Sequence, residues 1–235
     1  MSEPRKKLGA PALLAALLAA VTLLWGGYAW GAEQAPAKAA AEPPAAKAQG
    51  DPAALLEEAL GSLKQGRDEK AQAKITQAAK ALWQKLPLKL AQTILVAEPA
   101  KGYGIYQPRK DNVYLMASPD RPVFPGRGQP IYIYMKPLNY GLKSLPDGRQ
   151  EIYFAMDVEL LDAQGKELFG KKNFMKVKTV SRSYNREFFL NVTINLKGAP
   201  IGAYELRLTL KDLVKKQEAV ATVPVRLALA QPEKK

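Results

Sequence analysis

The sequence predicts a mainly β chain: an antiparallel β-sandwich preceded by a short helical hairpin, a disordered linker and an N-terminal signal or anchor helix. Two changes in pattern along the chain are the basis for this fold class. Apolar residues recur at helical spacing between residues 51 and 87, and from Leu88 onwards they alternate with polar residues. The stretch before residue 51 is first uncharged and apolar, and then rich in Ala and Pro. These patterns divide the 235 residues into segments 1–32, 33–50, 51–87, 88–230 and a disordered tail at 231–235.

The first 32 residues have the pattern of an export signal. Arg5, Lys6 and Lys7 are basic, and no charged residue follows from Leu8 to Ala32. This uncharged run is long enough to span a bilayer, and aromatic residues at positions 25, 28 and 30 match an interfacial belt. A cleaved signal peptide and a retained single-pass inner-membrane anchor therefore both remain open. Either one places the rest of the chain in the periplasm or outside the cytoplasm.

The next two segments are expected to be a mobile linker and a helical neck. Glu33–Gly50 contains eight Ala and three Pro but no Leu, Ile, Val or aromatic residue, so it lacks the side chains that build a core. Asp51-Pro52 is a typical helix start, and Pro87 ends the helical pattern. Between them lie two apolar stripes, one formed by Leu56, Leu60 and Leu63 and the other by Ile75, Ala79, Leu82 and Leu86. They predict two short amphipathic helices in a hairpin, the second beginning at about Asp68.

Alternating residues predict strands in the remainder of the chain. The pattern occurs within residues 88–96, 131–136, 152–160, 188–196, 204–211 and 223–229. In the first of these stretches, Leu88, Leu90, Ile94 and Val96 are expected to share one face. Turn signals at 147–148, 162–165 and 198–202 separate the runs, and Pro224 predicts that the last strand is an edge strand. Half-buried strands joined by short turns favour an antiparallel sandwich of the immunoglobulin-like type.

Two stretches resemble known bacterial sequences. Gly198–Asp212, with Tyr204 entering a run of alternating apolar residues, resembles the penultimate strand of bacterial immunoglobulin-like domains. Gly102–Arg109 together with Pro130–Pro137 resembles a group of uncharacterised exported bacterial proteins. The resemblance covers about residues 88–230 and implies fold and export, with no established activity to carry over.

Composition excludes several kinds of catalytic site. The chain has no Cys and no His, so it has no thiolate nucleophile, no Cys- or His-ligated metal and no conventional catalytic triad. Glycines at 61 and 66 have P-loop spacing, but the Lys-Ser/Thr pair that should follow is Arg67-Asp68. Asp157 and Glu159 share a strand face and could serve glycoside hydrolysis, but a solvated strand face is the favoured interpretation because nothing nearby indicates a cleft. We therefore expect a non-enzymatic protein without cofactor or metal.

Charge is the strongest remaining signal of function. The net charge is +13, and residues 100–235 contain 23 basic and 13 acidic residues. The densest stretch carries seven basic residues against the single acid Glu167, and these are Lys166, Lys171, Lys172, Lys176, Lys178, Arg182 and Arg186. Such a strip could bind anionic envelope polymers or a membrane surface, while nucleic acid is not expected outside the cytoplasm. The alternative is that these residues only keep strand edges soluble.

Tyrosines on strands are candidates for a protein interface. Tyr132, Tyr134 and Tyr153 lie opposite the apolar faces of their strands and are expected to include partly exposed rings. The leading hypothesis is an exported envelope protein whose basic sandwich binds a protein or an anionic surface. Alternatives are a structural or accessory spacer subunit of a periplasmic complex, contacted through the neck helices, and an unrecognised enzyme.

Overall fold

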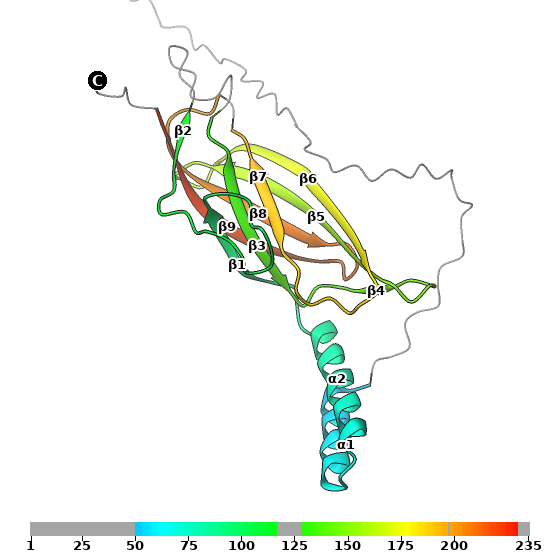
Figure 1. Ribbon diagram of the computed structural model, residues 1–235. Coiled ribbons are helices and arrows are strands. Elements are labelled where there is room, and N and C mark those ends of the chain that lie inside the picture. Colours follow the sequence, from blue (N-terminus) through cyan, green and yellow to red (C-terminus); the bar gives the residue numbers. More distant parts are fainter. Residues whose placement is uncertain (1–49, 117–127, 197, 230–235) are drawn as a thin grey trace, which may run out of the picture.

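The computed structural model describes residues 50–116, 128–196 and 198–229. The expected signal or anchor at 1–32, all of the linker 33–50 except Gly50, and the tail 231–235 lie outside them. Two helices come first and the remaining elements are strands, which confirms the predicted mainly β chain with helices at its start. The helices form a hairpin that projects from one end of the stacked sheets (Figure 1).

The hairpin consists of α1 (Pro52–Lys64) and α2 (Asp68–Lys85). Asp51 and Pro52 begin α1 as predicted, although the Asp51 side chain makes no capping hydrogen bond. Gly66 adopts a φ of 68° in the turn between the helices, a conformation that glycine reaches without strain. Neither helix is both long and apolar enough to cross a membrane, so the described residues contain no spanning helix.

The helices contact each other through one leucine and several small residues instead of the predicted stripes. The buried positions of α1 are Leu55, Ala59 and Ser62, and those of α2 are Ala71, Ala78 and Ala81. Every large member of the predicted stripes is exposed: Leu56, Leu60, Leu63, Ile75, Leu82 and Leu86. The expected periodicity is therefore present, but the stripe lies about 100° around each helix from the contact face.

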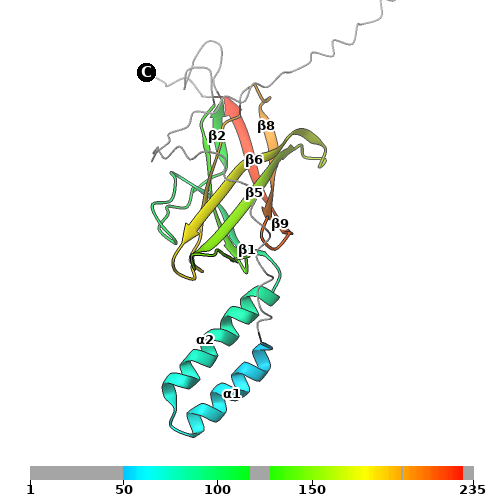
Figure 2. The ribbon, with the colours of Figure 1, turned by 90° about the vertical axis from the view of Figure 1, so that its right-hand side faces the viewer.

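The strands form two sheets that enclose the core between them (Figures 1 and 2). The three-stranded sheet has the order β1 (Lys89–Val96), β3 (Ile131–Leu138) and β7 (Leu190–Ile194). The larger sheet follows the order β2 (Val113–Met116), β9 (Gln217–Leu229), β8 (Gly202–Asp212), β5 (Gln150–Leu161) and β4 (Lys143–Ser144), and β6 (Glu167–Ser181) also pairs with β5. Because β4 and β8 share one side of β5, β6 covers its other side.

The strand pairs are antiparallel except for one. The short strand β2 runs parallel to the end of β9, with Val113 opposite Arg226 and Met116 opposite Leu229. Pro224 lies just before this parallel stretch, where β9 pairs with β8. The last strand is therefore an edge strand only over its first part, since β2 adds to its end.

The alternation seen in the sequence matches burial in most strands. One cluster joins inward-facing residues of both sheets, including Ile133 of β3, Phe154 of β5, Val192 of β7, Leu206 of β8 and Val225 of β9. Each of these side chains is at most 2% exposed, so the two sheets close a continuous core. The intervening positions on β5 and β8 carry the charged residues of the outer face.

The first strand departs from the alternation that we expected. The register of β1 shifts between Leu90 and Gln92, which is the position of a β-bulge. Leu90 consequently packs on the main core, whereas Ile94 and Val96 belong to a second cluster on the other side of the strand. The prediction that residues 88, 90, 94 and 96 share a face was wrong, because one extra residue reverses the alternation of a strand.

The junction between hairpin and sandwich is fixed by specific contacts. The indole N–H of Trp83 donates to the Tyr140 carbonyl at 2.8 Å, and the two rings meet edge to face with centroids 5.2 Å apart. Lys215 Nζ donates to the carbonyls of Leu86 at 2.6 Å and Asn139 at 2.9 Å. Burial lowers the pKa of Lys215. Helix α2 is thus held against the end of the sandwich by an aromatic contact and a half-buried cation.

Candidate functional site

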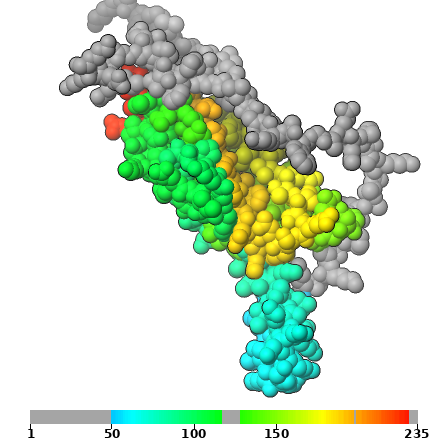
Figure 3. Space-filling model, viewed as in Figure 1, coloured from blue at the N-terminus to red at the C-terminus, as the bar shows by residue number. Residues whose placement is uncertain are grey.

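The basic residues of the predicted strip lie on and around one long strand, β6. The turn before β6 is tightened by Asp162, whose carboxylate accepts from the backbone N–H groups of Gln164 at 3.0 Å and Lys166 at 2.9 Å. From there β6 runs for 15 residues beside β5. None of the described strands pairs with its other edge. Figure 3 shows β6, in yellow, along one flank of the sandwich.

Most of the strip is exposed to solvent. Lys171 is half-buried with its ammonium 5.9 Å from the centre of the Phe174 ring. The exposed members are Lys166, Lys172, Lys176, Lys178, Arg182 and Arg186. An edge strand of this length with so many cations has the composition that prevents strand-to-strand aggregation, and the same composition attracts anions.

One lysine of the strip is already neutralised. Lys178 Nζ lies 2.7 Å from a carboxylate oxygen of Glu151 on β5, and 5.8 Å from the centre of the Tyr153 ring. The Glu151 hydrogen bond and charge raise the pKa of Lys178. By contrast, the structure gives no ion pair with a described residue for Lys166, Lys172, Lys176, Arg182 or Arg186. These five residues are the available part of the strip.

Asp157 and Glu159 on β5 are engaged by cations of β8. Lys211 Nζ lies 2.5 Å from one oxygen of Asp157, and Arg207 pairs with Glu159. The other Asp157 oxygen accepts from the backbone N–H of Asn173 at 2.8 Å, in a bulge of β6 where Asn173 has a φ of 51°. Burial alone would raise the pKa of Asp157, but the bonds from Lys211 and Asn173 outweigh it and the pKa is lowered. A carboxylate held ionised in this way does not suit the proton-donor role that glycoside hydrolysis requires.

Two arginines lie at the end of the β5–β6 pair. Arg149 and Arg182 directly precede and follow the register pair Gln150–Ser181, and both line a hollow of about 470 Å³ together with Asp147 and Gly148. Asp147 lies 2.6 Å from the Arg149 guanidinium, and its pKa is lowered by hydrogen bonds from the backbone and side chain of Arg149. Sequence reasoning missed Arg149, because its nearness to Arg182 depends on the register of a pairing that the sequence does not specify.

The three candidate interface tyrosines differ in burial. Tyr132 and Tyr153 are half-buried, in agreement with the expected partial exposure. Tyr134 is fully buried under the chain that follows β1, and its hydroxyl accepts from the backbone N–H of Gly104 at 3.0 Å. Its ring lies between those of Tyr106 and Phe189, at centroid distances of 4.4 and 5.6 Å. Tyr134 therefore serves packing in this structure.

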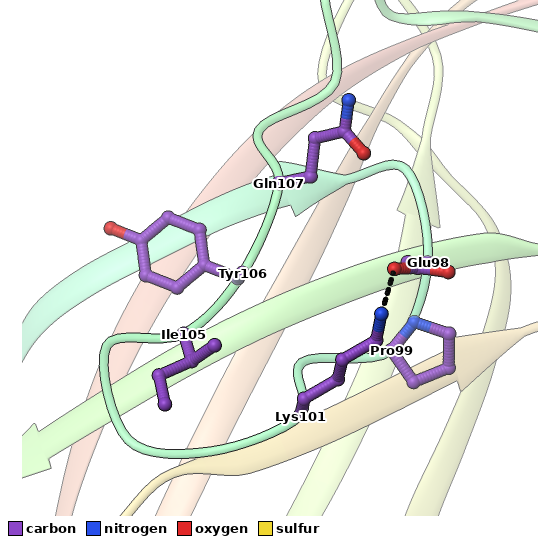
Figure 4. Close-up of a pocket in the computed structure, with 6 residues that line it drawn as sticks. All are labelled: Glu98, Pro99, Lys101, Ile105, Tyr106 and Gln107. Atoms are coloured by element: carbon purple, nitrogen blue, oxygen red, sulfur yellow. Dashed lines mark ion pairs between the residues drawn. The ribbon is translucent and has the colours of Figure 1, made fainter.

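The same segment after β1 forms a second, smaller hollow. It measures about 240 Å³ and is lined by residues 98, 99, 101 and 105–107. Glu98 and Lys101 form an ion pair across it at 3.2 Å, as Figure 4 shows. Its one cation thus already has a carboxylate partner, which makes this hollow a weaker candidate than the one between the arginines.

Nowhere in the described residues do three or more acidic side chains gather as a metal ion would require. No protein-family model matches the chain, and no curated protein matches it significantly. The site must therefore be interpreted from its own geometry.

Proposed function

We propose that the protein is a non-enzymatic, extracytoplasmic binding protein that engages an anionic partner through β6. The β6 site comprises Lys166, Lys172, Lys176, Arg182 and Arg186, with Arg149 beside Arg182. In this proposal residues 1–32 direct export or anchor the chain in the inner membrane, and residues 33–50 tether the folded part. The sandwich is of the immunoglobulin-like type, in which exposed strands and loops commonly provide binding surfaces.

The observation that carries the proposal is a contrast between neighbouring strands. On β8, Arg207 and Lys211 each have a carboxylate partner on β5, so their charges are used within the fold. On and beside β6, five exposed cations have no such partner among the described residues. Unpaired cations of one sign along a single edge produce a local positive potential that attracts polyanions and depends on salt concentration.

The arginine hollow gives this surface its most specific feature. Arg149 and Arg182 both line it, and Asp147 pairs with only one of the two guanidinium groups. A phosphate, sulfate or carboxylate group in the hollow would give Arg182 an anionic partner as well. Guanidinium groups bind such anions with paired hydrogen bonds, which favours an anionic polymer or lipid headgroup as the partner.

Retention on immobilised heparin, a sulfated polyanion, tests the proposal. The full chain in non-ionic detergent is compared with Lys176→Glu/Arg182→Glu and with the control Lys70→Glu/Lys110→Glu, which makes the same change in net charge at exposed positions away from β6. We expect the β6 variant to elute at clearly lower salt than the control, because localised contacts set the salt dependence. Equal elution of the two variants would show that only net charge matters, and would overturn the proposal.

A further inference from the structure

The helical hairpin has an apolar face that none of the described residues covers. Its six large side chains are between 41% and 53% exposed, and they are Leu56, Leu60, Leu63, Ile75, Leu82 and Leu86. With Ala79, they follow the alternating spacing of three and four residues that defines a coiled-coil seam. We refer to these seven residues as the heptad face.

Both stripes point to the same side of the hairpin. On α1 each stripe residue follows a contact residue by one position, as Leu60 follows Ala59, and on α2 Leu82 follows Ala81 in the same way. One position corresponds to a rotation of about 100° around a helix. Because the two helices run in opposite directions, equal rotations in chain order turn both stripes to the same side. The two stripes therefore form one continuous surface.

The opposite side of the hairpin is polar. The positions that precede the contact residues Ala59, Ala71 and Ala78 by one, about 100° around the helix in the other direction, carry Glu58, Lys70 and Gln77. Glu58 also forms an ion pair with Lys74 on α2 at 2.5 Å. The hairpin is thus amphipathic as a unit, with one polar side and one aliphatic side.

The hairpin has little core of its own. The buried cluster between its helices consists of Leu55, Ala78 and Ala81, so none of the large residues of the heptad face contributes to it. Isolated helices of this length are marginal in water and depend on packing of an apolar face. A second layer of helices against the heptad face would supply that packing.

We propose that the heptad face is covered by the heptad face of a second copy of this chain, giving a two-fold symmetric four-helix bundle. The face measures about 25 Å by 20 Å, on the order of 500 Å² for each copy and 1,000 Å² for the pair, from the lengths and diameters of the helices. That area reaches the lower bound for a specific protein interface. A two-fold axis pairs one surface with itself, and alternating three-four spacing is the packing pattern of four-helix bundles.

Features of the hairpin favour a second copy over a membrane surface. The heptad face contains only Leu, Ile and Ala, whereas helices that lie on membranes commonly place aromatic residues on the apolar side. The single Trp of the hairpin, Trp83, is engaged with Tyr140 at the junction. Polar positions carry both signs, including Glu57, Glu58, Lys70 and Lys74. The proposal does not depend on anion binding by β6.

Sedimentation equilibrium of the full chain, in a non-ionic detergent matched to the solvent density, tests the proposal. The wild type is expected to sediment with twice the chain mass. Leu60→Gln/Ile75→Gln/Leu82→Gln is expected to raise the dissociation constant at least about 100-fold. The control Leu168→Gln/Ile201→Gln/Val220→Gln removes similarly exposed apolar residues from the sandwich and should leave the dimer intact.

A second experiment remains decisive if the triple variant loses helix content by circular dichroism. Because the chain has no Cys, a single cysteine can report on neighbours in an otherwise wild-type protein. Leu60→Cys should form covalent dimers with a bis-maleimide reagent, whereas Gln77→Cys, on the polar side, should not.

Several outcomes would overturn the proposal. One is a monomeric wild type at all concentrations up to about 100 μM, well above the dissociation constants typical of specific interfaces. A monomer whose heptad face is protected from hydroxyl-radical labelling would mean that residues 1–49 of the same chain cover it. A third outcome is a wild type that stays monomeric but binds lipid vesicles. If the triple substitution abolished that binding, a membrane would be the partner that covers the heptad face.

Discussion

The sandwich and the hairpin place the same kinds of apolar residue in opposite environments. In the sandwich, Leu206, Leu208 and Leu210 of β8 are fully buried between two sheets. In the hairpin, Leu56 and Leu60 occupy equally regular positions and remain about half exposed. Periodicity therefore shows which residues share a face, but a single chain need not contain the surface that covers that face.

This difference separates a region that completes its own core from one that leaves its large apolar residues exposed. The sheets close around residues drawn from β1 to β9, so the sandwich has what it needs to fold alone. The hairpin gains only a small cluster from its own two helices. We therefore expect substitutions to affect the two regions differently, most strongly in the core of the sandwich and least on the polar side of the hairpin.

Truncation of a core side chain should have the largest effect. Phe154→Ala should lower the free energy of unfolding by about 3–5 kcal/mol, because it leaves a cavity between the sheets. Leu60→Ala should change the free energy of unfolding of the dilute monomer by less than about 0.5 kcal/mol, since the Leu60 side chain is already half exposed. Urea unfolding followed by fluorescence measures both values. Similar losses from the two substitutions would mean that the heptad face is covered within one chain.

Removal of a charge from the outer face of the sandwich should have an intermediate effect. Asp157→Asn should cost about 1–2 kcal/mol at pH 7, because Lys211 and the Asn173 N–H lose an ionised partner. The folded-state pKa of Asp157 is lowered, so the ionised carboxylate stabilises the fold above its unfolded pKa of 3.8 and this stability is lost as pH falls through the folded pKa. When the pH is lowered from 7 to below 4, the free energy of unfolding should therefore decrease less for the variant than for the wild type. Parallel pH profiles would contradict this role.

A smaller effect is expected at the junction between the two regions. Trp83→Phe removes the hydrogen bond to the Tyr140 carbonyl and should cost about 1 kcal/mol. Spin labels on Gln65→Cys and Thr222→Cys, one in each region, should then show a broader distance distribution by electron paramagnetic resonance. An unchanged distribution would indicate that the Lys215 bonds alone hold the junction.

The smallest effect is expected on the polar side of the hairpin. Glu58 is solvent-exposed and paired with Lys74, and the hydrogen bond from Lys74 lowers the pKa of Glu58. Exposed ion pairs contribute little to stability, so Glu58→Gln should leave the thermal midpoint within experimental scatter. A clear drop in the midpoint would mean that this side of the hairpin is also covered.

Regular strands were the most predictable part of the fold. On β5 and β8 the strict alternation around Phe154 and Leu206 identified the buried faces, because each strand is paired without interruption over most of its length. On β1 the bulge after Leu90 could not be foreseen, since one extra residue leaves no mark in the composition. The short strand β2 was missed for a similar reason, being only four residues long.

The candidate sites were less predictable than the fold. The run of cations from Lys166 to Arg186 was visible in the sequence, whereas the pairing of Lys178 with Glu151 depends on the register of β5 and β6. On α1 the sequence contains two adjacent apolar stripes, beginning at Leu55 and Leu56, and either could have faced α2. The small residues Ala59 and Ser62 allow close approach of the helices, which explains why the contact uses the first stripe.

Hydrogen–deuterium exchange of the full chain at a series of protein concentrations tests the contrast between the two regions most directly. If the heptad face is buried by a second copy, exchange protection of α1 and α2 should increase with concentration while that of β5 and β8 stays constant. Equal exchange protection of the helices at nanomolar and micromolar protein concentration would contradict burial by a second copy. A concentration-dependent change in the protection of β5 and β8, parallel to that of the helices, would also contradict it.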